Sequence, residues 1–308
     1  MAAQHSSNAA EQASLATKIS NTEAGITHIA PGLWRIAVPS RTLPPFDHSN
    51  SYLLASRGVG VLVDMGGDSP AALASIDAAL QQAEVTLFKA LLLTHSHSDH
   101  IAGVGALVAH YDLPLYLHPL EWPRLEQHLQ TSGTSPAITM LRDGHKLTVG
   151  DQLIEVLHTP GHSAGHLSFY LPELRTLLAG DMLASHGSTW VGLPEGDIAQ
   201  YLQSLTRLEQ QAAELIAPGH GDPIHNPRER LQQVRAHRLA REQQLLDILA
   251  EQQSDLATLC QRIYPELPNA KVQDLAQRSL LAQLQKLMAE MKVMHLGNDE
   301  QGPYALRR

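Results

Sequence analysis

The chain has 308 residues, of which 43% are hydrophobic and 17% charged, and its formal net charge at pH 7 is −9. This length suits one large α/β domain with an appendage, or two ordinary domains. The negative charge is concentrated in residues 1–222, which carry −11, whereas residues 223–308 carry +2. An acidic body is a poor match for nucleic acid, because phosphate neutralisation dominates that affinity.

The cysteine content and the chain's apolar runs exclude further classes. One cysteine, Cys260, rules out a disulfide framework and a thiolate zinc site, whereas 18 histidines leave imidazole and carboxylate as metal ligands. No apolar run approaches the ~20 residues that span a bilayer, so we expect no membrane interaction. The start lacks a secretory pattern, which predicts a cytoplasmic protein, and polar residues 1–22 are predicted to form a disordered tail.

Strand and helix patterns alternate through the first two thirds of the chain, which predicts the α/β class. One helix is predicted to start at Ser69, followed by Pro70 at its first position. The predicted strands are 26–38, 50–56, 58–67, 88–95, 113–119, 145–158 and 166–179, and the predicted helices are 69–83, 102–111 and 197–211.

The texture changes after Pro223, where glycine becomes rare and helical patterns dominate. Helices are predicted over 226–252, 254–265 and 270–293, followed by a turn and a short hairpin that includes 303–308. This order is typical of a winged helix. We therefore predict a main domain over 23–225, and a linker helix with a small winged-helix domain over 226–308.

The stretch "THSHSDH", residues 94–100, carries the strongest chemical signal. His95 and His97 lie two apart just past a strand end, so their side chains can point to one side. Asp99 and His100 follow where the next helix should begin. A histidine-rich chain produces isolated pairs by chance, but the complete H-x-H-x-D-H string is much rarer. The stretch therefore predicts a metal site.

Three later segments favour a larger catalytic site over a single structural ion. "HTPGHSAGH" offers His162, "LLAGDML" offers Asp181, and "LIAPGHGDP" offers His220. Each residue is expected at a strand-to-loop junction beside glycine, where catalytic groups of α/β folds tend to lie.

The motifs H-x-H-x-D-H, T-P-G-H, G-D and P-G-H-G, in this order, resemble the metallo-β-lactamase-fold hydrolase superfamily. The nearest resemblance is to its metallo-β-lactamase-like protein 2 group, through "GDMLASHGST", "APGHGDPIHN" and the C-terminal pattern. The resemblance implies a four-layer αβ/βα sandwich with a dinuclear centre at its edge. It implies a first ion held by His95, His97 and His162, a second held by Asp99, His100 and His220, and Asp181 as the bridge.

The chemistry of these side chains agrees with that implication. Imidazole and carboxylate suit Zn²⁺, two per chain, and also fit Fe or Mn. Two close divalent ions lower the pKa of a shared water toward neutrality, which supplies a nucleophile for a carbonyl or phosphoryl centre. Asp99 is predicted to be catalytic, because its carboxylate can orient this nucleophile and carry a proton to the leaving group.

Three functions remain open at this point. The first is a zinc hydrolase of an ester-, thioester- or amide-like bond in a small or carrier-linked substrate. The second is a metal-dependent single-strand endoribonuclease, an activity that the protein 2 group includes. The third is a non-enzymatic binding protein that retains metal. Asp181 argues against a dedicated β-lactamase, because those enzymes usually use another ligand arrangement there.

Several other residues have two interpretations each. His166 either orients a ligand or is a structural turn histidine, and we expect no direct ligation by it. His186 and Ser188 either contact substrate or are ordinary loop residues. The C-terminal region either binds nucleic acid, covers the active-site cleft, or mediates a dimer. Its charge of +2 falls short of a basic stripe, which favours the covering role.

Overall fold

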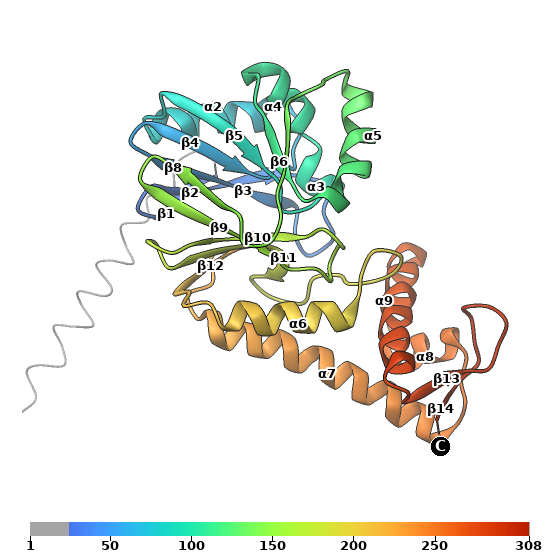
Figure 1. Cartoon of the computed structure of the whole chain (residues 1–308). Coiled ribbons are helices and arrows are strands. Elements are labelled where there is room, and N and C mark those ends of the chain that lie inside the picture. The colour runs from blue at the N-terminus through green and yellow to red at the C-terminus, as the bar shows by residue number, and fades with distance from the viewer. Residues whose placement is uncertain (1–24, 308) are drawn as a thin grey trace, which may run out of the picture. The chain divides into compact units, whose positions relative to one another are not determined.

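The computed structural model describes residues 25–307, so the tail predicted for residues 1–22 lies outside the described residues. The chain is organised as two compact units. Their helices and strands are labelled in Figure 1. Unit 1 comprises the chain as far as Leu117, with Trp122–Leu141 and Lys146–Glu155, and unit 2 comprises His118–Glu121, Arg142–His145 and the chain from Val156 onward.

Unit 1 contains a seven-stranded mixed sheet in the order β1-β2-β3-β4-β5-β6-β7. The first four strands form an antiparallel meander, and β4 to β7 pair in parallel. The strands are β1 (Ile26–Ala30), β2 (Leu33–Pro39), β3 (His48–Ser56), β4 (Val59–Val63), β5 (Leu87–Leu92), β6 (Leu115–Leu117) and β7 (Ile138–Met140).

Helices lie against this sheet (Figure 1). Aliphatic side chains form the core between them. Ile76, Leu107 and Leu125 are fully buried there. Ser69 caps the first helix as predicted, since its side chain accepts a hydrogen bond from the N–H of Ala72. The helices are α2 (Pro70–Gln82), α3 (Ser98–Ile101), α4 (Val104–Tyr111) and α5 (Trp122–Ser132).

The second sheet has five strands in the order β12-β11-β10-β9-β8. It is also mixed, because β8–β9 and β10–β11 pair antiparallel and β11–β12 pair in parallel. All nine residues of β11 are buried, as expected for a strand with neighbours on both sides. The strands are β8 (Lys146–Val149), β9 (Gln152–His158), β10 (Leu167–Leu171), β11 (Thr176–Ala184) and β12 (Leu215–His220). Two mixed sheets with helices confirm the α/β class.

Unit 2 also contains the C-terminal helices and hairpin. The helix predicted over 226–252 is present as α7. Buried apolar side chains of the C-terminal helices and of the hairpin pack together in one core. Cys260 lies in that core, where burial raises the pKa of its thiol. Within residues 25–307, no helix has the length and apolar character that crossing a membrane requires. The remaining elements are the short 3-10 helix η1 (Pro119–Glu121), α6 (Ile198–Glu209), α7 (Pro227–Glu251), α8 (Leu256–Ile263), α9 (Ala270–Ala289), β13 (Val293–His295) and β14 (Tyr304–Leu306).

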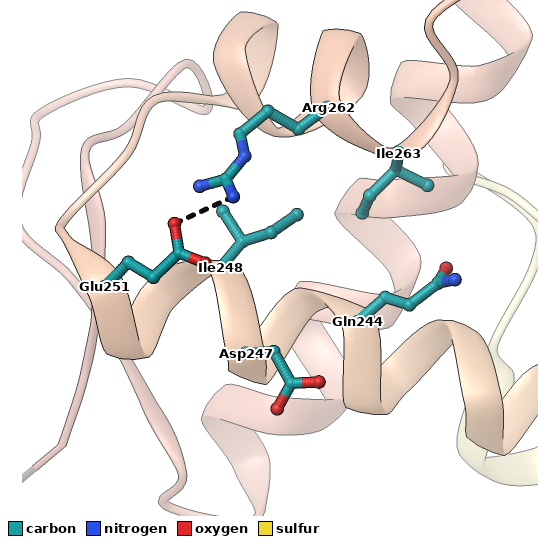
Figure 2. A pocket seen from close by; sticks show the side chains of 6 residues that line it. All are labelled: Gln244, Asp247, Ile248, Glu251, Arg262 and Ile263. Carbon is teal, nitrogen blue, oxygen red and sulfur yellow. Dashed lines mark ion pairs between the residues drawn. The ribbon is translucent and has the colours of Figure 1, made fainter.

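A small pocket lies between α7 and α8 (Figure 2). Its volume is about 250 Å³, and an ion pair of 2.8 Å joins Arg262 of α8 to Glu251 of α7 beside it. The Arg262 and Glu251 side chains are 36% and 63% exposed, so the pair adds about 1 kcal/mol at most. The pocket's lining includes no predicted metal ligand: it consists of Gln244, Asp247, Ile248, Glu251, Arg262 and Ile263.

A buried carboxylate ties α7 to α9. Glu242 accepts hydrogen bonds from Lys286 at 2.5 Å and from Gln283 at 3.0 Å, and Lys292 adds a third contact at 3.1 Å. Only 9% of the Glu242 and Lys286 side chains is exposed. Lys286 also pairs with Glu290 at 2.7 Å, but the Glu290 side chain is 37% exposed, so removal of Glu242 takes away the more buried of its two partners.

We predict that Glu242→Ala lowers the free energy of unfolding by about 2 kcal/mol, because buried Lys286 and Gln283 lose the carboxylate that accepts from both. Denaturant unfolding measures this change. Glu229→Ala is the matched control on the same helix, since Glu229 is exposed and accepts from the Gln233 side chain. Equal effects of the two substitutions would contradict the prediction.

Candidate metal centre

In unit 1, the loop after β5 gathers three histidine rings. The ring centroid of His95 lies 4.6 Å from that of His97 and 4.2 Å from that of His100. His97 occupies the N-cap of α3, and Asp99 and His100 lie within that helix, as the sequence predicted. His95 and His100 are fully buried, so their nitrogens are shielded from bulk water. The H-x-H-x-D-H motif therefore forms one compact set of donors.

This loop needs glycine in the segment that it packs against. The N–H of Met65 donates to the carbonyl of His100, and the N–H of Gly103 donates to the carbonyl of Met65, each at 2.9 Å. A Cβ added to Gly66 would lie 1.9 Å from the carbonyl oxygen of Asp99. Only glycine permits this approach, so Gly66 allows α3 to pack closely against the segment after β4.

Asp64 orients two of the histidines, a role that the sequence analysis missed. Its carboxylate accepts from the Nδ1–H of His100 at 2.8 Å and from the hydroxyl of Thr94 at 2.7 Å. Because the Thr94 hydroxyl donates to Asp64, its oxygen accepts from the Nδ1–H of His95 at 2.9 Å. Each ring thus presents Nε2 as its basic nitrogen. Asp64 adopts a left-handed conformation with φ +60, which aspartate tolerates better than most residues.

In unit 2, a buried carboxylate lies between two imidazoles. The Oδ2 of Asp181 is 3.5 Å from the Nε2 of His162, and its Oδ1 is 3.3 Å from the Nε2 of His220. The three residues are between 3% and 7% exposed. His220 ends β12 and His162 lies in the loop after β9, as predicted, whereas β11 continues through Asp181 to Ala184. These three predicted residues are therefore brought together.

The T-P-G-H loop is held closely against α6. Gly161 has φ +135, and a Cβ there would lie 2.3 Å from the Cα of Tyr201, so the position requires glycine. The carbonyl of Gly161 accepts from the N–H of Asp197 at 2.9 Å. His162 donates its Nδ1–H to the carbonyl of Trp190 at 2.7 Å, which leaves Nε2 facing Asp181.

His166 orients the backbone of Asp181. The N–H of Asp181 donates to the Nε2 of His166 at 3.1 Å, so the ring carries its proton on Nδ1 and donates it to Thr159 at 2.9 Å. The Thr159 hydroxyl lies 2.9 Å from that of Ser168 and completes the chain. Of the two interpretations of His166, orientation of a ligand residue fits these contacts. His186 and Ser188 are exposed loop residues.

Glu121 fixes the other side of the T-P-G-H loop and was also missed. Its carboxylate is 5% exposed and accepts from the Ser163 hydroxyl at 2.7 Å and the Gly165 N–H at 2.9 Å. Nearby, His118 stacks on His158 with ring centroids 4.4 Å apart. Burial and the neighbouring His158 lower the pKa of His118 to about 4, so this stacked ring is neutral near pH 7.

The donor chemistry of these residues fits a metal. Nδ1 is hydrogen-bonded in His95, His100 and His162, which leaves Nε2 as the donor of each ring. Neutral imidazole with carboxylate is a ligand set for Zn and other first-row divalent ions. Across residues 25–307, the groups of side chains that could hold a metal ion draw on seven residues: His95, His97, Asp99, His100, His162, Asp181 and His220.

Comparisons with known proteins find similarity to the metallo-beta-lactamase superfamily in both sequence and structure. The sequence model of the metallo-beta-lactamase superfamily matches residues 44–220. The chain is 30% identical to a metallo-beta-lactamase family protein of Thermus thermophilus, whose crystal structure superposes with a TM-score of 0.72 over 90% of this chain and 99% of that one. It is 28% identical to an atrochrysone carboxyl ACP thioesterase of Passalora fulva, over 87% of this chain and 79% of that protein. It is 27% identical to a beta-lactamase-like protein 2 homolog of Drosophila melanogaster, over 75% of this chain and 78% of that protein.

We predict that Asp64→Asn weakens metal binding about tenfold or more, because an amide replaces the carboxylate that accepts from both His100 and Thr94. Competition with a chelating dye measures the dissociation constants. Asp77→Asn is the control, since Asp77 is exposed on α2 and accepts from Tyr111. Unchanged metal affinity in Asp64→Asn would refute the orienting role.

Proposed function

Because the chain belongs to the metallo-β-lactamase superfamily, it is a metal-dependent hydrolase, and we propose that it hydrolyses a carrier-linked acyl thioester at a centre of two zinc ions. The observation that carries the thioester assignment is the similarity to the acyl carrier protein thioesterase over 87% of this chain. The imidazole and carboxylate donors support zinc, and the same donors accept iron or manganese.

We assign the seven residues to two ions. The first ion takes His95, His97 and His162, and the second takes Asp99, His100 and His220, with Asp181 as the bridge. The potential metal-holding groups include both of these triads, which supports the assignment. The position of the Asp181 carboxylate between His162 and His220 supports its bridging role, because it offers one oxygen toward each imidazole.

The protein groups around this centre then have defined tasks. When bound, the two ions would supply a water of lowered pKa and polarise the thioester carbonyl. The carboxylate of Asp99 would accept a proton from the attacking water and return it to the thiolate leaving group, so that the products are a carboxylic acid and a thiol. Asp64 and His166 would hold the ligand residues in place through the transfer.

For residues 226–308 we retain the winged-helix assignment as part of the proposal. The order α8, α9 and the β13–β14 hairpin supports it. Ser254 and Tyr304 also exchange two backbone hydrogen bonds of 3.0 and 2.8 Å, which adds a third short pairing beside the hairpin. The charge of +2 over 223–308 does not favour RNA as the substrate. RNA cleavage is therefore measured as the alternative activity in the experiment below.

Asp99→Ala is expected to lower kcat for acyl-pantetheine and acyl-carrier-protein thioesters at least 100-fold, because it removes the group that moves the proton. Thiol release measures the rate, and a chelator should abolish it in the wild type. Asp247→Ala, an exposed aspartate of α7, is the control and should leave the rate unchanged.

The same enzyme is offered lactones, β-lactams and labelled single-stranded RNA. Thioester turnover above the other substrates supports the proposal. Chelator-sensitive RNA cleavage without thioester turnover would replace it with the nuclease function, and full thioester activity in Asp99→Ala would refute the assigned role of that residue.

A further inference from the structure

The segment after Asp181, residues 184–193, is held at many points by the C-terminal helices, all within unit 2. We propose that Trp190 is a positioning residue for the metal ligand His162, and that α9 fixes Trp190 in the position this requires. The inference rests on the proposed metal centre, and it assigns to α9 a role in metal affinity.

The segment contacts His162 through the backbone carbonyl of Trp190. The Nδ1–H of His162 donates to the backbone carbonyl of Trp190 at 2.7 Å, and Nε2 then faces the Asp181 carboxylate at 3.5 Å. The hydrogen bond at Nδ1 fixes the orientation of the imidazole ring. The direction of the Nε2 lone pair therefore depends on where the carbonyl acceptor lies. The acceptor is a backbone atom, so its position depends on how residue 190 is anchored.

Trp190 is itself held by a hydrogen bond to α9. Its indole Nε1–H donates to the carbonyl of Leu275 in α9 at 3.0 Å. About one turn along the same helix, the carbonyl of Arg278 accepts from the N–H of Leu193 at 3.2 Å. Two backbone carbonyls of α9 therefore hold the segment on either side of Val191, which is fully buried. Among these contacts, the indole N–H is the side-chain group that a substitution can remove.

A second contact, from Arg238 of α7, holds the residue before Trp190. Buried Arg238 donates from its guanidinium to the carbonyl of Thr189 and lies over the ring of Tyr201, 5.1 Å from its centroid. The Tyr201 hydroxyl donates to the carbonyl of Met182 at 2.7 Å, and it lies 3.1 Å from the Thr189 hydroxyl. These contacts restrict the residue that precedes Trp190, so the carbonyl that orients His162 is fixed from both sides.

The test compares Trp190→Phe with Trp34→Phe, a matched loss of an indole N–H on β2 of unit 1. Zinc is titrated into metal-free protein in competition with a chelating dye that resolves two dissociation constants. We expect Trp190→Phe to weaken one of the two ions about tenfold and to leave the other unchanged. Trp34→Phe should leave both constants unchanged, and thermal unfolding of the metal-free variants reports on folding.

Two results would overturn the inference. One is binding of both ions by Trp190→Phe as tightly as by the wild type. The other is equal weakening of both ions together with a lowered unfolding temperature of the metal-free variant, which would indicate general destabilisation. A wild type that binds a single ion would overturn the two-ion centre, and the tenfold loss for that ion would still be expected of Trp190→Phe.

A second pair of variants tests the α7 anchor if Trp190→Phe fails to fold. Arg238→Met keeps a long apolar side chain and removes the donor to Thr189, and it should weaken the same ion selectively. Arg235→Met is the control on the same helix, because Arg235 is exposed and lies 3.8 Å from Glu209. Equal zinc affinities in these two variants would also overturn the inference.

Discussion

The proposed metal centre depends on one constraint: each predicted ligand histidine must offer a basic nitrogen in a fixed direction. An imidazole does this when its other nitrogen donates to a fixed acceptor. Asp64 provides that acceptor for His100, and for His95 through Thr94, while the Trp190 carbonyl provides it for His162. The surrounding elements are arranged to hold these acceptors still.

The acceptors are held by two different means. In unit 1, Asp64 follows a buried strand, and Gly66 admits the ligand-bearing helix to a distance that no other residue allows. In unit 2, the acceptor is a loop carbonyl, and hydrogen bonds from this loop to α9 and from α7 to this loop hold the residues around it. Under the proposed function, α7 and α9 therefore support the metal centre although they are remote in sequence from His162.

The sequence revealed the seven ligand candidates because each lies in a short motif next to the end of a predicted strand. It did not reveal their supports, since these are defined only by contacts across long separations, 36 residues for Asp64 with His100 and 28 for Trp190 with His162. The sequence did not predict helix α5, because its buried residues are Leu125 and Leu129 in an otherwise polar segment, which gives a weak apolar pattern. The α/β class and the C-terminal helices were predictable from periodicity, because their apolar patterns are long.

The proposed function rests on two metal ions held by the seven predicted ligand residues. Anomalous diffraction from crystals grown with zinc tests it most directly. The account predicts two zinc peaks about 3.5–4 Å apart, with Asp181 between them and His162 bound through Nε2. A single peak, or two ions held by other residues, would contradict it.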